Sequence, residues 1–197
     1  QYRVFRKLTP EPLFAEGAAK THFSWHMLTG GNAFDVFRPE ALKAETLRHP
    51  FREAPRMRDN FTRLNFGWLG YWLPGEQTVG TQPDQLELVT SKAAAWDCPV
   101  SIHANPATLA QHPRTADNFE VFRRWEQVRA RKWLTEEQKL MLRDPDQEFT
   151  LLLDEHGQFE LVACERVEGA AGGSREVIAY TFARLGAVCA MYWHICA

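Results

Sequence analysis

The fold is decided by residues 61–104, which read FTRLNFGWLGYWLPGEQTVGTQPDQLELVTSKAAAWDCPVSIHA. The apolar run at 61–69 predicts a β-strand that ends in a Gly-Trp loop. Pro83 then suits the first turn of a helix, and apolar residues recur after it at helical spacing. The compact run at 98–104 predicts a buried parallel strand. Strand, helix and strand in this order indicate a βα unit of a parallel sheet.

The helical pattern continues to about Arg143. Asp117 with Glu120 predicts a capping box, and Thr135 with Gln138 predicts a second one before a short helix. The first of these helices carries an apolar stripe of four residues: Phe119, Phe122, Trp125 and Val128. We therefore predict that residues 1–144 form a series of βα units of the α/β class.

After Asp144-Pro145 the pattern changes to strand, turn and strand. The runs EFTLLLD and FELVACERV predict one hairpin, and EVIAYTFAR and AVCAMYWHICA predict another around Leu185-Gly186. We predict that residues 145–197 form antiparallel β hairpins, as in part of a β-sandwich. The chain begins with Gln1 and stops inside the last predicted strand, so we expect it to be a piece of something longer.

Composition limits the classes of partner. There are 23 basic and 25 acidic residues, a balance that gives no electrostatic reason for a nucleic-acid or membrane-surface partner. No apolar run approaches the roughly 20 residues of a membrane span. The sequence has neither a GxGxxG nor a GxxxxGK[ST] loop, so we expect no nucleotide cofactor. The four cysteines have no zinc-ribbon spacing and are expected to be buried, because they are too few for a disulfide scaffold.

Two carboxylates are candidates for acid–base chemistry. Glu16 follows the apolar run Leu13-Phe14-Ala15, and barrel enzymes place catalytic groups at the carboxyl ends of such strands. Asp35 is its nearest candidate partner in sequence. Glycoside hydrolysis needs two carboxyl groups that flank the scissile bond. The alternatives are an exposed loop glutamate at Glu16 and an Asp35 that only caps a local turn.

His22 and His26 are four residues apart, so a helix would place both on one face. Zinc enzymes use this spacing in HExxH, but here Phe-Ser-Trp intervenes without a glutamate. A metal would need a third ligand, for which His103 is the attractive candidate. The histidines could instead contact a polar ligand, with Trp25 beside them, or serve only as structural residues.

Polar and aromatic residues recur where successive predicted strands end. They are Asn32 after a Gly-Gly turn, Asn65 and Trp68 with Tyr71 and Trp72, and then His103 with Asn105. Aromatic residues after a strand suit a sugar-binding platform, and a hydrophobic lid is the alternative. We take Asn32, Asn65, Trp68 and His103 as candidate substrate contacts.

Several segments together resemble the late strands of a (β/α)8 barrel from bacterial polysaccharide-degrading glycoside hydrolases. The segments are AEG, HFSWHMLTGGNAFDVF, NFGWLGYW and AAAWDCPVSIHA. The following DNFEVFRRWEQVR, then LTEEQK and the β hairpins, resemble the passage from such a barrel to an appended β-sandwich. The resemblance implies an exported carbohydrate-active hydrolase, secreted or periplasmic, that acts on an oligo- or polysaccharide. It also implies that Glu16 is a rim acid and that His22, His26, Trp68 and His103 contact the substrate.

The chain departs from this family in its length. Three or four βα units are too few to close an eight-stranded barrel of about 250 residues. We therefore expect either self-association or a missing N-terminal half. Two other hypotheses stay open, a non-catalytic carbohydrate-binding or interaction module and a metallohydrolase that uses His22, His26 and His103.

Overall fold

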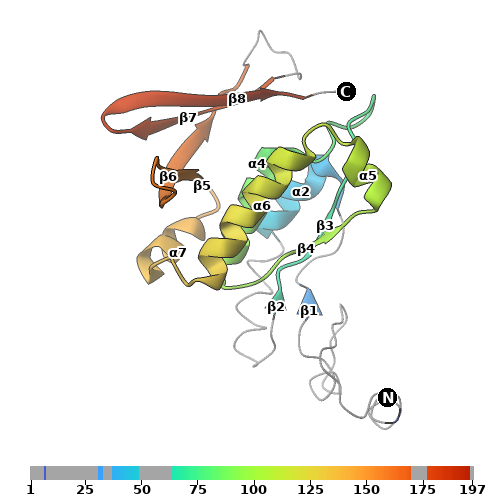
Figure 1. The fold of residues 1–197 in the computed structure, drawn as a ribbon, viewed down its shortest axis with the longest axis horizontal. Coiled ribbons are helices and arrows are strands. Elements are labelled where there is room, and N and C mark those ends of the chain that lie inside the picture. The colour runs from blue at the N-terminus through green and yellow to red at the C-terminus, as the bar shows by residue number, and fades with distance from the viewer. Residues whose placement is uncertain (1–6, 8–30, 33–36, 49–63, 170–176, 196–197) are drawn as a thin grey trace.

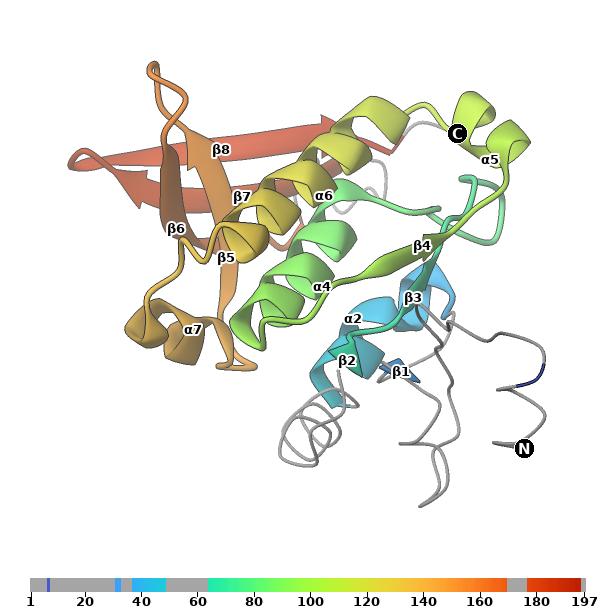
Figure 2. The same ribbon diagram turned by 60° about the horizontal axis from the view of Figure 1, so that its bottom comes forward.

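The computed structural model describes residues 7, 31–32, 37–48, 64–169 and 177–195. In these residues the protein is mixed α/β, with short parallel strands, a layer of helices and a separate four-stranded antiparallel sheet (Figure 1). The two long helices α4 (Pro83–Ala95) and α6 (Thr115–Ala130) lie between the parallel strands and the antiparallel sheet, as the turned view also shows (Figure 2). The predicted α/β class is therefore confirmed, whereas a closed barrel is not formed by the described strands.

The parallel strands form two registered pairs. β1 (Gly31–Asn32) pairs with β2 (Leu64–Asn65), and β3 (Trp68–Gly70) pairs with β4 (Ser101–His103). The two residues between β2 and β3 are bonded to the chain that leads into β4. Phe66 N donates to Pro99 O at 2.8 Å, and Ser101 N donates to Gly67 O at 3.1 Å. Residues 64–70 thus follow one strand path with a local break, because Phe66-Gly67 interrupts the regular ladder.

Five helices of the described chain join and cover these strands. They are α2 (Pro39–Arg48), α4 (Pro83–Ala95), α5 (Pro106–Gln111), α6 (Thr115–Ala130) and α7 (Glu136–Leu142). Pro83 is the first residue of α4, so the prediction of a first-turn proline is confirmed. A proline fits there because the first helical N–H has no partner within the helix.

Only one of the two predicted capping boxes forms. Thr135 Oγ1 accepts from Gln138 N at 3.2 Å and Gln138 Oε1 accepts from Thr135 N at 2.9 Å, which confirms the start of α7. The box at Asp117 was wrong, because α6 already begins at Thr115 and Glu120 pairs with arginines on its own helix. In the predicted stripe of α6, Trp125 and Val128 are buried, whereas Phe119 is 39% exposed.

Helix α4 is buried on nearly all sides because two hydrophobic clusters meet on it. The cluster toward the parallel strands contains Leu42, Phe66, Leu69, Leu86, Val89, Ala93, Cys98 and Val100. The cluster toward α6, α7 and the antiparallel sheet contains Ala94, Ala95, Trp125, Val128, Leu134, Leu142, Phe149 and Leu151. Any polar side chain on α4 must therefore find a partner inside the protein.

The antiparallel sheet has the order β5-β6-β7-β8. Its strands are β5 (Glu148–Leu153), β6 (Phe159–Arg166), β7 (Val177–Arg184) and β8 (Ala187–His194). Both predicted hairpins are confirmed. Leu185 and Gly186 connect β7 to β8 with φ of 51° and 78°, the left-handed geometry of a tight two-residue turn.

The link between α7 and β5 is fixed to α4. Lys92 Nζ donates to the carbonyl oxygens of Asp144 and Gln147, and Arg143 donates to the carbonyl of Ala95 at 2.7 Å. Burial lowers the pKa of Lys92 to about 8. These contacts hold the first strand of the antiparallel sheet beside the helix layer.

No helix in the described part of the chain is long and apolar enough to cross a membrane.

Candidate functional site

One face of the parallel strands is polar. The face toward the helices carries Leu69 and Ile102, which pack in the hydrophobic cluster against α4. Side chains alternate along a strand, so Trp68 and Ser101 lie on the opposite face, where the register pairs them directly. We call Asn65, Trp68, Ser101 and His103 the polar face.

Hydrogen bonds fix the amide of the polar face. Asn65 Nδ2 donates to Ser101 Oγ at 2.7 Å, and Asn65 Oδ1 accepts from Gly67 N at 3.1 Å. His103 ends β4 and is exposed. The register of β1 places Asn32 opposite Asn65 on the neighbouring strand. The predicted contacts Asn65, Trp68 and His103 are thus brought to one face.

The other predicted site residues cannot be placed in this geometry. Glu16, His22, Trp25, His26 and Asp35 lie outside the described residues. In the described part of the chain, no group of three or more His, Cys, Asp or Glu side chains could hold a metal ion.

Tyr71 and Trp72, which the sequence offered as a platform or lid, have structural roles. Tyr71 is buried, and its hydroxyl lies 3.1 Å from Thr115 Oγ1 and accepts from Asn118 Nδ2 at 2.9 Å. Trp72 Nε1 donates to Phe37 O at 3.2 Å. The side chain of Asn105 caps α5. These residues support the strand ends; Tyr71 is buried, Trp72 is half-buried and Asn105 is exposed.

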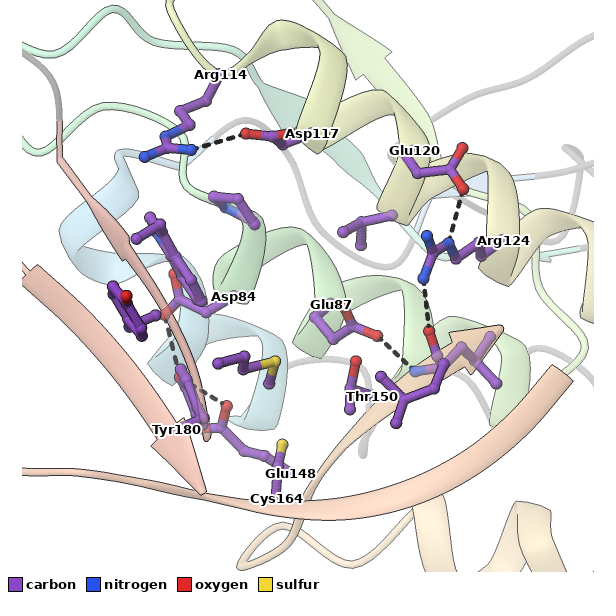
Figure 3. A pocket seen from close by; sticks show the side chains of 17 residues that line it. Asp84, Glu87, Arg114, Asp117, Glu120, Arg124, Glu148, Thr150, Cys164 and Tyr180 are labelled. Carbon is purple, nitrogen blue, oxygen red and sulfur yellow. Dashed lines mark hydrogen bonds and ion pairs between the residues drawn. The ribbon is translucent and has the colours of Figure 1, made fainter. Parts of the chain in front are cut away.

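A second feature is a pocket of about 360 Å³ between the helix layer and the antiparallel sheet, which we call the junction pocket (Figure 3). Helix α4 contributes Asp84 and Glu87. Helix α6, with Arg114 directly before it, contributes the pairs Arg114–Asp117 and Arg124–Glu120. The sheet contributes side chains from all four strands, including Glu148, Thr150, Cys164, Tyr180, Met191 and Trp193. The volume lies at the lower end of the range for small-molecule sites, about 300–1,000 Å³.

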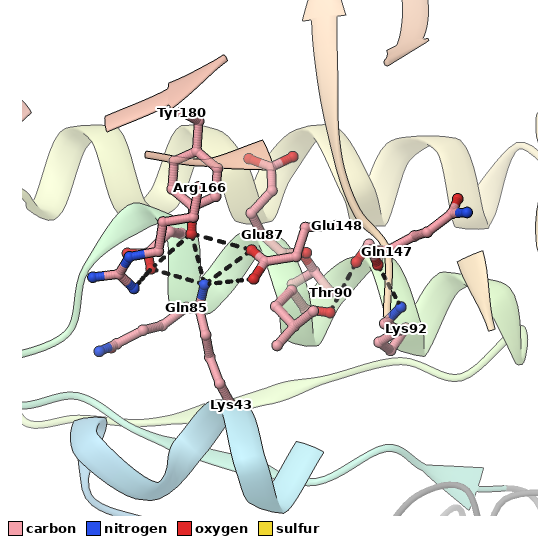
Figure 4. Close-up of polar contacts among 12 residues, drawn as sticks. Lys43, Gln85, Glu87, Thr90, Lys92, Gln147, Glu148, Arg166 and Tyr180 are labelled. Carbon is pink, nitrogen blue, oxygen red and sulfur yellow. Dashed lines mark hydrogen bonds and ion pairs between the residues drawn. The ribbon is translucent and has the colours of Figure 1, made fainter. Parts of the chain in front are cut away.

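A charged cluster closes one side of the junction pocket. Lys43 Nζ lies 3.0 Å from Asp84 Oδ2 and 2.9 Å from Glu148 Oε2, and it donates to the Tyr180 hydroxyl at 2.7 Å (Figure 4). The Tyr180 hydroxyl is also 3.2 Å from Asp84 Oδ2 and 3.1 Å from Glu148 Oε2. Burial, and then the negative charges of Asp84 and Glu148, raise the pKa of Tyr180, so it stays a neutral donor.

Glu87 is a carboxyl group of the junction pocket with a raised pKa. Its Oε1 accepts from Trp125 Nε1 at 2.6 Å and from Leu151 N at 3.1 Å. Burial raises its pKa to about 7 despite these hydrogen bonds, because the protein replaces most of the water that would solvate the charge. A carboxyl with this pKa can gain and release a proton near neutral pH.

Cys164 lines the same pocket but is not a nucleophile. Burial, with the nearby charges of Glu148 and Glu87, raises the pKa of its thiol to about 12. The thiolate is the reactive form, so Cys164 remains an unreactive thiol at neutral pH.

Sequence patterns did not identify Asp84, Glu87, Glu148 or Tyr180 as candidate site residues. One signal was present, because Glu87 stands between Leu86 and Leu88 in the otherwise apolar run LELV of a helix. An acid in such a setting is buried and needs partners. Ser101 could have been found from the alternation in VSIH, which predicts a strand with one polar face rather than a fully buried one.

Comparison with known proteins finds no matching family model, no matching curated protein and no matching solved structure.

Proposed function

We propose that this protein is a carbohydrate-active hydrolase that holds its sugar on the polar face of the parallel strands. The observation that supports this is the gathering of Asn65, Trp68 and His103 on one face, although they belong to three strands, β2, β3 and β4. An amide, a hydroxyl and an imidazole can exchange hydrogen bonds with sugar hydroxyls, and an indole packs against the apolar C–H face of a sugar ring.

The acid–base step is assigned to residues outside the polar face. Asn65, Trp68, Ser101 and His103 include no carboxyl group, whereas glycoside hydrolysis uses two. The resemblance supplies Glu16 as the general acid, which would protonate the leaving oxygen. Asp35 would be the second carboxylate, acting as base or nucleophile.

The proposed barrel architecture agrees with the parallel pairing. β1, the strand path of residues 64–70 and β4 are each followed by a helix, and apolar residues of β3 and β4 face α4. In a (β/α)8 barrel the other face of the strands points to the barrel interior and the substrate. The polar face would then line the substrate site, and the antiparallel sheet would be the appended domain.

The test combines an activity assay with a binding assay on oligosaccharides from a panel of plant and bacterial polysaccharides. Glu16→Gln should abolish the release of reducing ends and leave oligosaccharide binding unchanged. Trp68→Ala should weaken binding at least about tenfold, since it removes about 1.4 kcal/mol or more of ring contact. Phe119→Ala, which removes a part-exposed aromatic ring on α6, is the control and should change neither.

The outcomes separate the alternatives. Binding without turnover, lost in Trp68→Ala, would support a non-catalytic carbohydrate-binding module instead. Turnover that persists in Glu16→Gln would refute the assignment of the acid. Neither binding nor turnover on the whole panel would refute the proposal.

A further inference from the structure

Two side chains that line the junction pocket each have a buried hydrogen-bonding atom that no described residue satisfies. Asp84 has a side chain that is only 4% exposed, and its Oδ1 accepts no hydrogen bond within the described part of the protein. Trp193 Nε1 is buried as well and donates none to any described residue. A buried polar group without a partner is unfavourable, so two of them in one pocket wall indicate a missing partner.

The contacts around each atom explain why it is left open. Asp84 Oδ2 is engaged by Lys43 at 3.0 Å and by Tyr180 at 3.2 Å, so the carboxylate is held in place while Oδ1 stays available. The Trp193 ring stacks on Tyr180, with centroids 6.0 Å apart and an interplanar angle of 11°. Both side chains are therefore positioned by neighbours rather than free to turn toward other partners.

The pair of open atoms restricts the chemistry of the missing partner. Asp84 Oδ1 needs a donor, and Trp193 Nε1 needs an acceptor. A simple cation would leave the indole N–H unpaired. An anion would face the carboxylates of Asp84 and Glu148, whereas the two arginines of the wall, Arg114 and Arg124, are already paired with Asp117 and Glu120. A hydroxyl group serves as donor and acceptor, so a molecule with several hydroxyls meets both needs without bringing a charge.

The rest of the wall fits the apolar part of such a molecule. Met191 and Val121 line the pocket beside the stacked Tyr180–Trp193 pair. Glu87 Oε1 already accepts from Trp125 and Leu151, and Asp84 Oδ1 is a buried acceptor of α4 without a partner in the described part of the chain. Figure 3 places Arg114 and Asp117 on one side of the pocket and Tyr180, Glu148 and Cys164 on the opposite side, with Asp84 and Glu87 between them.

We propose that the junction pocket binds a small neutral polyhydroxylated molecule of about the size of one sugar ring, with its hydroxyls bound by Asp84 Oδ1 and Trp193 Nε1. This site is separate from the polar face and independent of the proposed hydrolase function. The pocket volume of about 360 Å³ suits a single ring and not an oligosaccharide.

The test follows the indole N–H of Trp193 by NMR, with its resonance assigned from the Trp193→Phe variant. D-glucose, D-galactose, D-mannose, D-xylose, L-arabinose and myo-inositol are added separately at millimolar concentrations. At least one of them should shift this resonance in a saturable manner. Trp193→Phe and Asp84→Asn should each weaken binding of that compound at least about fivefold by calorimetry, because each changes one hydrogen-bonding partner. Trp133→Phe, on a residue that does not line the pocket, is the matched control and should bind as the parent does.

Three results would overturn the proposal. The first is a Trp193 resonance that no compound of the panel moves. The second is a shift produced by glycine, methylammonium or inorganic phosphate but by none of the polyols, which would indicate a charged ligand. The third is polyol binding that Trp193→Phe leaves unchanged and Trp68→Ala abolishes, which would place the sugar on the polar face alone. Circular dichroism of each variant verifies that the fold is kept.

Discussion

At the scale of single residues, Glu87 joins three elements through one oxygen. It belongs to α4, and its Oε1 accepts from Trp125 on α6 and from the backbone of Leu151 on β5. The unfolded chain solvates the same carboxyl fully, which gives the pKa of 4.5 against about 7 in the folded protein. The protonation state of this one group therefore couples the folding equilibrium to pH.

The direction of that coupling can be predicted. Between about pH 4.5 and 7 the folded protein keeps a proton on Glu87 that the unfolded chain has released, so stability falls as the pH rises through this window. A shift of this size corresponds to up to about 3 kcal/mol of unfolding free energy. Glu87→Gln keeps an acceptor for Trp125 and Leu151 but cannot ionise, and should remove this fall. Urea unfolding at about pH 5 and about pH 8 measures the difference.

Glu120→Gln is the control for this prediction. The hydrogen bond from Arg123 and the contacts with Arg124 lower the pKa of Glu120 to about 2, so its contribution is lost only as the pH falls below its unfolded value of 4.5. The unfolding free energy of the Glu120→Gln protein should change between the two pH values by as much as that of the parent. A Glu87→Gln protein that also retains the parental change would show that another group is responsible.

At the scale of elements, the β7–β8 hairpin contains a residue that does not suit its backbone. Leu185 has φ of 51° and a side chain that is 94% exposed. The left-handed conformation is unfavourable for leucine by roughly 1–2 kcal/mol, and asparagine tolerates it better. Leu185→Asn should therefore raise the unfolding free energy by up to about 1 kcal/mol in urea denaturation.

A matched substitution separates backbone strain from simple loss of exposed apolar surface. Leu140→Asn also replaces an exposed leucine, but on helix α7, where asparagine is a poorer helix former. It should lower stability slightly. An equal gain from both substitutions would contradict the explanation based on the turn.

The elements that the sequence predicts well are those with a short-range signal. The Thr135–Gln138 box and the Leu185-Gly186 turn each depend on residues at most three positions apart in the chain, and both form. The Asp117–Glu120 box failed because arginines on the same helix compete for Glu120 at 2.7 Å. A spacing rule detects the acid and the cap but not these competitors.

The same distinction explains what could be predicted of the sites. The polar face follows from strand alternation and parallel register, so Asn65, Trp68 and His103 were identifiable as candidates. In the wall of the junction pocket the Tyr180 hydroxyl contacts Asp84, and these residues are separated by 96 positions in the chain. No local pattern specifies that contact, because it depends on how the antiparallel sheet lies on the helix layer.

At the scale of the whole molecule, Lys43 links the layers. It reaches from α2 to Asp84 on α4, to Glu148 on β5 and to Tyr180 on β7. Asp84 and Glu148 are brought close together by the fold, and their mutual repulsion is offset by this one ammonium group. Arg166 is 3.9 Å from Asp84 and gives only weaker compensation.

Removal of Lys43 should therefore loosen the attachment of the antiparallel sheet. Lys43→Met leaves two neighbouring carboxylates without their shared cation, and losing one partner of a largely buried pair typically lowers stability by about 3 kcal/mol. Arg48→Met, which breaks an exposed pair with Glu45 on the same helix, should lower it by less than about 1 kcal/mol. Urea unfolding gives both values, and hydrogen exchange of the β7 amides reports whether the sheet is the part that opens.

A second substitution tests whether repulsion between Asp84 and Glu148 causes the loss of stability in Lys43→Met. Glu148→Gln in the Lys43→Met background removes one of the two negative charges and keeps a hydrogen-bond acceptor for Tyr180, so it should restore part of the lost stability and of the β7 protection. If repulsion were not the cause, the double variant would be no more stable than Lys43→Met alone. The junction pocket shares Asp84, Glu148 and Tyr180 with this cluster, so the same pair of variants also shows whether the fixed position of Asp84 depends on the charge balance across the layers.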